Sequence, residues 1–234
     1  MDTTPLIDSK TTFELRKVSK VYQVGASQVQ ALKDINLKFA SGDFLSITGP
    51  SGSGKTTLLN ILGCLDVPTH GEVIIDDQII LPKLSRDKIK IRRKKIGFIF
   101  QRFNLIPVLT VFENVEYPLI LLKNKRKIRK SLVKKALADV GLSNKSKHFP
   151  NQLSGGECQR ASIARALVKM PRLVLADEPT ANLDSQTGMR IIELMKKLNQ
   201  EEKITFIFST HDSQLLSSVN KVVVLHDGTI RNHV

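Results

Sequence analysis

The sequence predicts an α/β fold in which helices cover both faces of a mainly parallel sheet. Short apolar runs recur along the chain, and between them lie segments whose apolar residues have helical spacing. This alternation is typical of parallel sheets, because the crossover between two parallel strands is usually a helix. A second observation concerns residues 102 to about 157, which contain helical patterns but no convincing strand. They predict a helical subdomain inserted into the α/β core.

The elements are expected in the following order. Residues 13–18 and 31–39 alternate apolar and polar positions, as a strand with one buried face does. Residues 43–48 form a mostly apolar run that stops at a Gly-Pro pair, and residues 55–65 follow with helical spacing. Further strands are predicted at residues 96–100, 173–176, 204–208 and 222–225, and further helices at residues 111–122, 128–140, 157–168 and 188–199.

Length and composition restrict the class of protein. A chain of 234 residues with 41% hydrophobic and 25% charged residues has enough apolar surface for a core, and its composition excludes disordered and collagenous classes. No apolar stretch approaches the roughly 18–20 residues that cross a bilayer, and the N-terminus has no secretory apolar region. Cys64 and Cys158 lie far apart without a CxxC pair, so we expect reduced thiols in a cytoplasmic protein.

The formal net charge of +14 comes from two short segments. Residues 83–95 carry eight basic residues and one acid, and residues 123–135 carry eight basic residues and no acid, which leaves the remainder at −1. The segments are either solvated helix faces or surfaces attracted to an anionic membrane. Nucleic acid is not expected as a partner, because no aromatic residues are interleaved with these clusters, as binding of single strands would favour.

Residues 49–56 read GPSGSGKT and match the pattern G-x-x-x-x-G-K-[ST]. Glycine lets backbone N–H groups turn toward phosphate oxygens, and the following helix directs its positive N-terminus at the same anion. Lys55 is placed to reach the β- and γ-phosphates of ATP, Thr56 to ligate Mg²⁺, and Thr57 to bond an oxygen nearer the ribose. The predicted ATP-binding residues of this loop are Gly49, Pro50, Ser51, Gly52, Ser53, Gly54, Lys55, Thr56 and Thr57.

The apolar run at residues 173–176 ends in Asp177, and Glu178 follows at once. At the carboxyl edge of a parallel sheet, Asp177 would lie beside the phosphate loop, where it can hold Mg²⁺ directly or through water. Glu178 would face the space beyond the γ-phosphate and is predicted to orient and deprotonate the attacking water. The alternative is a solvated Asp-Glu pair that begins a turn before Pro179.

Residues 153–157 read LSGGE and open a helical pattern. By composition, a serine and two glycines at this place form a good helix cap that also exposes N–H groups to an anion. As a string, however, Leu153, Ser154, Gly155, Gly156 and Glu157 resemble the signature of the ATP-binding-cassette (ABC) ATPases. The resemblance extends over nearly the whole chain.

The resemblance implies roles for further positions. Tyr22 matches the aromatic residue that stacks on adenine, and Gln101 matches the glutamine that senses Mg²⁺ and the attacking water and couples to the transport partner. Residues 181–184, which end in Asp184, resemble the loop that crosses the dimer, and His211 resembles the switch histidine that contacts the γ-phosphate. The implied catalytic residues are Glu178, His211 and Gln101, and the implied Mg²⁺ ligands are Thr56, Gln101 and Asp177.

The resemblance also implies an architecture and partners. The fold would be a P-loop NTPase core with a mainly parallel sheet, an N-terminal antiparallel β subdomain and an inserted helical subdomain. A single ABC domain is expected over residues 1–234, with the core and β subdomain at about 12–101 and 158–234 and the helical subdomain at about 102–157. Two chains would form a head-to-tail homodimer around two ATP molecules, with Ser154 and Gly156 contacting the γ-phosphate in trans. The dimer would drive a separate integral-membrane permease from the cytoplasmic surface of the membrane.

Residues 60–71 and 97–122 look like the ATPase subunits of lipoprotein-releasing and macrolide-export systems. Lipoprotein release or export of a drug or peptide is therefore the expected activity. The alternatives are an ABC-type ATPase that acts on nucleic acid, a cell-division ABC ATPase, and a regulatory ATP sensor without catalysis. Cys158 stands where Gln is common; a thiol at a helix N-terminus could be a redox switch, but an ordinary helix residue is the favoured interpretation.

Overall fold

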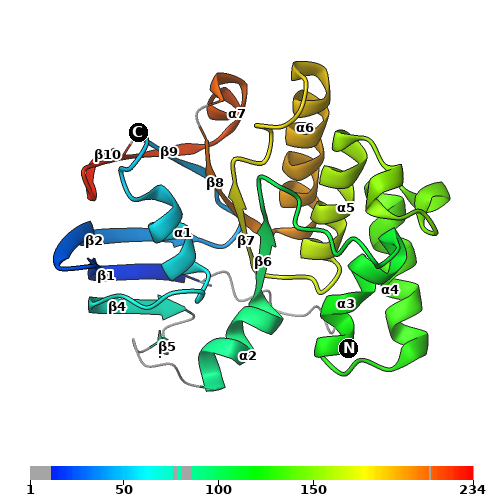
Figure 1. Ribbon diagram of the computed structural model, residues 1–234, viewed down its shortest axis with the longest axis horizontal. Helices are drawn as coiled ribbons and strands as arrows, with labels where there is room; N and C mark the ends of the chain where they lie inside the picture. Colours follow the sequence, from blue (N-terminus) through cyan, green and yellow to red (C-terminus); the bar gives the residue numbers. More distant parts are fainter. Residues whose placement is uncertain (1–11, 76–77, 81–85, 211, 234) are drawn as a thin grey trace, which may run out of the picture.

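The computed structural model describes residues 12–75, 78–80, 86–210 and 212–233, which form two sheets and a set of helices (Figure 1). The six-stranded sheet crosses the middle of the molecule, the smaller sheet lies at its left in Figure 1, and helices cover its right side. None of the helices in these ranges is long and apolar enough to cross a membrane. The predicted α/β class with a mainly parallel sheet is confirmed.

The larger sheet has the strand order β10-β9-β3-β8-β7-β6. All neighbouring strands in it run parallel except the edge pair β9 and β10. Every apolar run predicted as a buried strand lies in this sheet, because coverage of both faces demands an almost continuously apolar strand. The strands are β3 (Phe44–Thr48), β6 (Ile96–Ile99), β7 (Leu173–Asp177), β8 (Thr205–Ser209), β9 (Lys221–His226) and β10 (Thr229–His233).

The smaller sheet is antiparallel, as expected for the N-terminal region, and has the order β2-β1-β4-β5. Its first two strands are longer than the predicted segments 13–18 and 31–39. Irregular register between Leu15 and Val21 interrupts the alternation of side chains, so the apolar pattern does not show the full length of the hairpin. The strands are β1 (Thr12–Val24), β2 (Ser27–Ala40), β4 (His70–Ile75) and β5 (Gln78–Ile80).

The predicted helices are present with shifted ends. The first ends at Leu62 rather than at residue 65, because the chain turns at Cys64 with a φ of 53°. The helix predicted from residue 188 begins at Ser185, because the Asp184 side chain accepts a hydrogen bond from the Thr187 N–H and caps it. The α-helices are α1 (Lys55–Leu62), α2 (Arg86–Lys95), α3 (Val111–Leu121), α4 (Arg126–Asp139), α5 (Gly155–Leu167), α6 (Ser185–Glu202) and α7 (Ser213–Ser218), and short 3₁₀ turns span Ser143–Lys145 and Pro150–Gln152.

Residues 102–157, where an inserted helical subdomain is predicted, contain α3, α4 and the two 3₁₀ turns, and no strand lies among them. The boundary expected at residue 157 falls inside α5, which continues from Gly155 to Leu167. The proposed division into subdomains stays a prediction.

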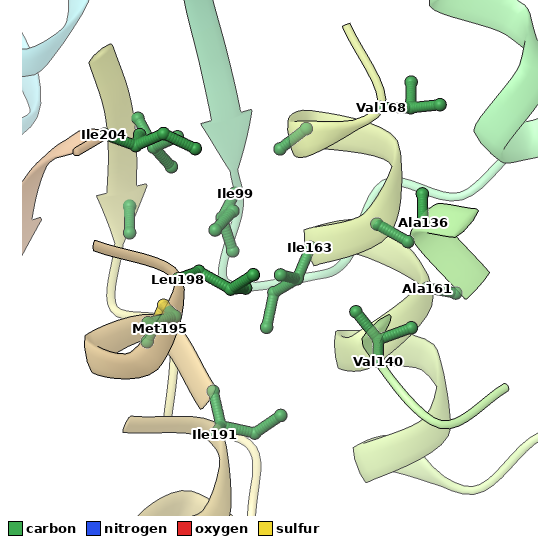
Figure 2. Packing of buried hydrophobic residues seen from close by; sticks show 14 of the residues in the cluster. Ile99, Ala136, Val140, Ala161, Ile163, Val168, Ile191, Met195, Leu198 and Ile204 are labelled. Carbon is green, nitrogen blue, oxygen red and sulfur yellow. The ribbon is translucent and has the colours of Figure 1, made fainter. Parts of the chain in front are cut away.

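The six-stranded sheet separates two hydrophobic clusters. Phe206 and Phe208 of β8 face the cluster that contains α3, α4, α5 and α6, whereas Ile207 between them faces the other cluster. Figure 2 shows part of the first cluster, where Ile99 of β6 lies near Ile163 of α5 and Leu198 of α6. In the second cluster, Leu58 of α1 packs with residues of both sheets. Helix α1 is therefore held between the two sheets, with its N-terminus at the loop that follows β3.

Candidate active site

The loop between β3 and α1 requires glycine at particular positions. Gly49 and Gly54 have φ angles of 151° and 103°. A Cβ on Gly49 would lie 2.0 Å from the carbonyl oxygen of Leu225, and one on Gly54 would lie 2.5 Å from that of Ala31. Only glycine fits such close approaches, so the backbone can form a tight cradle whose N–H groups and helix N-terminus can bind an anion.

Lys55 and Ser53 supply the polar groups of this cradle. The Lys55 ammonium donates hydrogen bonds to the carbonyl oxygens of Gly49 and Pro50 at 2.7 and 2.9 Å, which holds it over the loop. The Ser53 hydroxyl is buried and has no hydrogen-bond partner in the part of the chain that the structure describes. A cation, an unpartnered hydroxyl and the first N–H groups of α1 together fit the phosphate groups of a nucleotide.

Asp177 and Glu178 lie at the same edge of the sheet as the phosphate loop. The Thr56 hydroxyl is 3.5 Å from a carboxylate oxygen of Asp177, at the end of β7. Glu178 has a φ of 47°, and its N–H donates to the carbonyl oxygen of Ser209 on β8 at 2.8 Å. The sheet thus places a hydroxyl and a carboxylate, both ligand types that Mg²⁺ prefers, next to the cradle, with a second carboxylate one residue further.

Gln101 follows β6, the edge strand beside β7, and is exposed. Its carbonyl oxygen accepts a hydrogen bond from the Asn182 side-chain amide at 2.7 Å. The loop after β6 is also held by Arg165 of α5, whose guanidinium donates to the carbonyl oxygens of Phe103, at 2.7 Å, and of Asn104. The loop that carries Gln101 is therefore bonded both to the loop before α6 and to α5.

Ser154 and Glu157 form a capping box at the start of α5. The Glu157 N–H donates to the Ser154 hydroxyl at 3.3 Å, and the Glu157 carboxylate accepts from the Ser154 N–H at 2.9 Å. The Ser154 N–H and the Lys145 ammonium, 3.3 Å away, lower the pKa of Glu157. Among the described residues, the side chains of Ser154 and Glu157 are bonded to each other's N–H groups and to Lys145, and neither is bonded to the phosphate loop.

The residue predicted to stack on adenine is also held in place. The Tyr22 hydroxyl donates to one carboxylate oxygen of Asp66 at 2.7 Å, and the Lys20 ammonium donates to the other at 2.7 Å. The same ammonium lies 4.8 Å from the centroid of the Tyr22 ring. Burial and the neighbouring Asp66 raise the pKa of Tyr22, whereas the Thr57 hydroxyl acts in the opposite direction. This aromatic ring therefore lies close to the phosphate loop.

Several residues that connect the site were not predicted. Gln159 of α5 is fully buried and donates to the carbonyl oxygen of Pro179 at 2.6 Å, and Thr180 donates to the Asp212 carboxylate at 2.9 Å. They join α5 and the loop after β8 to the turn that follows Glu178. Burial of Gln159 could have been predicted from the sequence, because Gln159 lies one helical turn before Ile163, on the apolar face of the helical pattern. Asp66 and Asn182 gave no comparable signal.

Asp184, His211 and Cys158 are the remaining positions singled out from the sequence. Asp184 is exposed and caps α6, and the Thr187 N–H lowers its pKa. His211 lies outside the described residues. Cys158 is buried, and burial raises the pKa of its thiol, the opposite of what a reactive thiol requires. The structure therefore supports an ordinary helix residue at position 158.

A phosphate cradle beside an Asp-Glu pair at the carboxyl edge of a parallel sheet defines a P-loop nucleoside triphosphatase. A family model described as ABC transporter matches residues 32–181, which is more than half of the chain. The chain belongs to the ABC transporter family and is an ATP-binding ATPase of that family.

The similarity to known relatives extends over almost the full length of this chain. MJ0796 of Methanocaldococcus jannaschii, named an uncharacterized ABC transporter ATP-binding protein, is 48% identical over 225 residues that cover 93% of this chain and 94% of that protein. A solved dimeric structure of that cassette, in a post-hydrolysis state bound to ADP and Pi, has a TM-score of 0.87 at 46% identity and covers 95% of this chain and 97% of its own. The macrolide export ATP-binding/permease protein MacB of Syntrophobacter fumaroxidans is 42% identical over 223 residues, which are 93% of this chain but 31% of MacB.

Proposed function

We propose that this chain is the motor subunit of a transporter, which hydrolyses two ATP molecules at a head-to-tail dimer interface and drives a separate membrane permease. The observation that carries the proposal is the placement of Glu178 directly after Asp177, at the sheet edge that also holds the phosphate loop. A carboxylate beside bound phosphates is suited to accept a proton from an attacking water molecule.

Each residue of the site then has a chemical role. The loop N–H groups and Lys55 bind the phosphates, and Tyr22 packs against the adenine. Thr56 and Asp177, together with Gln101, would hold Mg²⁺, which neutralises charge on the phosphate oxygens when it is bound. Glu178 orients the water molecule and takes its proton. His211 is proposed to contact the γ-phosphate.

The proposed dimer explains the position of the signature. Ser154 and Gly155 are exposed at the start of a helix, and in this chain the Ser154 hydroxyl is bonded to the Glu157 N–H rather than to the phosphate loop. A partner's phosphate loop could receive the Ser154 hydroxyl and the Gly156 N–H, which would complete the site. The similar cassette of MJ0796 was solved as a dimer.

The permease partner is supported by the relatives and by a groove beside the Gln101 loop. The name of MacB joins ATP binding and permease, and this chain matches about a third of that protein. The groove has a volume of about 290 Å³, and Phe98, Phe100 and Pro118 give it an apolar lining, with Arg165 at one side. Because Arg165 also holds the backbone of residues 103 and 104, a permease segment in this groove would act on the Gln101 loop. Lipoprotein release or drug or peptide export from the cytoplasmic face of the membrane is the proposed activity.

Replacement of Glu178 by Gln tests the catalytic assignment. The amide cannot accept the proton, so steady-state phosphate release should fall by about 10²–10⁴-fold. ATP should still bind, and gel filtration with ATP should show an accumulated dimer. Glu193→Gln, on the exposed face of α6, is the matched control and should leave the rate unchanged. Normal turnover by Glu178→Gln would contradict the assignment.

A further inference from the structure

The two basic segments of the sequence meet in one groove. The first segment contributes residues of α2, and the second contributes Lys123, which follows the C-terminal end of α3. The groove has a volume of about 420 Å³. It is lined by Ile89, Lys90, Arg93, Lys94, Leu121, Leu122 and Lys123.

Within the part of the chain that the structure describes, no acidic side chain neutralises the positive charge of this groove. Its lining holds Lys90, Arg93, Lys94 and Lys123, and none of its described residues is acidic. Throughout the described ranges, none of these four side chains makes an ion pair or a hydrogen bond, in contrast to Arg129, which lies 2.9 Å from the Glu116 carboxylate. Unpaired cations that converge on one concave surface attract an anion, and the attraction weakens as salt rises.

The apolar residues of the lining indicate which class of anion the groove would bind. Ile89 and Leu121 are 40% and 42% exposed, so the groove presents aliphatic surface between its cations. None of the described residues in the lining is aromatic, so none could stack on a nucleic-acid base. A molecule with an anionic headgroup and a hydrocarbon portion satisfies both the cations and the aliphatic side chains. These are the properties of an anionic phospholipid.

The groove lies at the amino ends of the parallel strands, whereas the phosphate loop lies at their carboxyl ends. Helix α2 leads directly into the first residue of β6, whereas the phosphate loop follows the last residue of β3, and both strands run in the same direction. Figure 1 shows α2 at the foot of β6, near the lower end of α3. A ligand in this groove therefore leaves the nucleotide site accessible.

We propose that the groove between α2 and the end of α3 binds the headgroups of anionic phospholipids at a membrane surface. This inference goes beyond the proposed transport function, since it requires neither ATP nor the permease. It assigns Lys90, Arg93 and Lys94 of the first basic segment and Lys123 of the second to a single lipid-binding surface of the isolated chain.

Vesicle binding of the full chain tests this inference. We would measure cosedimentation with vesicles of phosphatidylcholine alone and of phosphatidylcholine mixed with phosphatidylglycerol, at low and at high salt. The triple variant Lys90→Glu, Arg93→Glu, Lys123→Glu should lower partitioning to the mixed vesicles by about a hundredfold. The control variant Lys33→Glu, Arg190→Glu, Lys196→Glu makes the same charge change at exposed positions elsewhere and should bind nearly as well as the unchanged chain.

A second variant tests the aliphatic surface without a change of charge. Ile89→Gln, at an exposed position of α2, should weaken vesicle binding several-fold and leave ATP hydrolysis unchanged. Equal losses in the groove and control variants would overturn the proposal. It would also be overturned if duplex DNA or polyglutamate bound as tightly as the mixed vesicles and responded to the same substitutions, because the groove would then be a general polyanion surface.

Discussion

Single residues set the shape of the candidate site through their backbone conformation. Gly49 and Gly54 occupy positions where a Cβ would collide with a carbonyl oxygen, and Glu178 has a φ of 47° although it carries a side chain. Such a conformation costs about 1–3 kcal/mol outside glycine and is retained where neighbouring bonds stabilise it. For Glu178, the hydrogen bond from its N–H to the carbonyl oxygen of Ser209 on β8 stabilises this conformation. The pairing of β7 with β8 therefore helps to fix where the Glu178 carboxylate lies.

Asp66 connects the adenine side of the site to the protein and provides a test at the residue scale. Burial alone would raise the pKa of its carboxyl, but the bonds from Lys20 and Tyr22 outweigh burial and lower the pKa. In Asp66→Asn the Lys20 ammonium loses its ionic partner and Tyr22 keeps only a neutral acceptor. We expect a loss of about 1–3 kcal/mol in the free energy of unfolding and a several-fold weaker affinity for ATP.

Chemical unfolding, ATP titration and turnover at saturating ATP together check this expectation. The rate at saturation should stay near that of the unchanged chain, because Asp66 acts through Tyr22 and has no contact with the catalytic carboxylates. Asp34→Asn changes a carboxylate that is bonded to Ser19 on the same sheet and serves as the control. A lower rate at saturation with unchanged ATP affinity would show that Asp66 has another role.

At the scale of secondary structure, α5 connects more parts of the site than any other single element among those described. It begins at the signature serine, Gln159 holds the turn after Glu178, and Arg165 holds the loop after Gln101. A displacement of the signature by a partner would therefore be transmitted along one rigid helix to two catalytic loops. This connection is a physical route for coupling, and double-mutant cycles between Gln159 and Arg165 would measure its strength.

The residue just beyond α5 gives a pH-dependent prediction. Burial lowers the pKa of Lys169 from 10.5 to about 8, and its ammonium donates to the carbonyl oxygen of Arg92 at 3.0 Å. The charged form is thus disfavoured in the folded protein, at a cost that approaches about 3 kcal/mol below pH 8. As the pH rises from about 8 toward 10, the folded chain binds fewer protons than the unfolded chain, and stability from this group rises.

Lys169→Met removes this titration. The variant should be more stable than the unchanged chain near neutral pH, and its advantage should decrease as the pH approaches 10. Urea unfolding at several pH values measures the difference, with the exposed Lys196→Met as the control. An advantage that did not change with pH would falsify the assignment of the effect to the Lys169 ammonium.

At the scale of the whole molecule, each chain is proposed to carry two half-sites rather than one complete site. The phosphate loop and catalytic carboxylates form one half, and the signature at the start of α5 forms the other. Lys55→Ala should abolish hydrolysis by loss of phosphate binding, and Ser154→Arg should abolish it by obstruction of the interface.

Mixing these two inactive chains tests the head-to-tail arrangement. In a mixed dimer, the intact phosphate loop of one chain meets the intact signature of the other, so about a quarter of the normal activity should return if the chains exchange freely and sites act independently. Each variant alone should stay inactive, and a mixture of Lys55→Ala with Glu178→Gln should not recover, because both changes lie in the same half-site. Failure of the first mixture to recover would contradict a site shared between chains.

The local pattern of residues was sufficient to predict much of the fold. Apolar runs predicted β3, β6, β7, β8 and β9 of the six-stranded sheet, since a strand covered on both faces must be apolar throughout. The helix ends, the strands β4, β5 and β10, and the helices α2 and α7 were not predicted. The basic segment of α2 lacks a broad apolar face, and the hairpin of β1 and β2 contains register shifts that hide its length. Such features depend on neighbours that are distant along the chain.

For the site, the sequence alone determined which groups are available, because the phosphate loop, the Asp-Glu pair and the signature are contiguous strings. Only the tertiary structure decided how they are connected: that Asn182 holds Gln101, that Gln159 holds the turn after Glu178, and that Asp66 holds Tyr22. It also decided that basic residues of two separate segments, Lys90, Arg93 and Lys94 of one and Lys123 of the other, line one groove. These contacts join residues that the fold brings together from separate elements, and a side chain's partners in space leave no periodic signal in the order of residues along the chain.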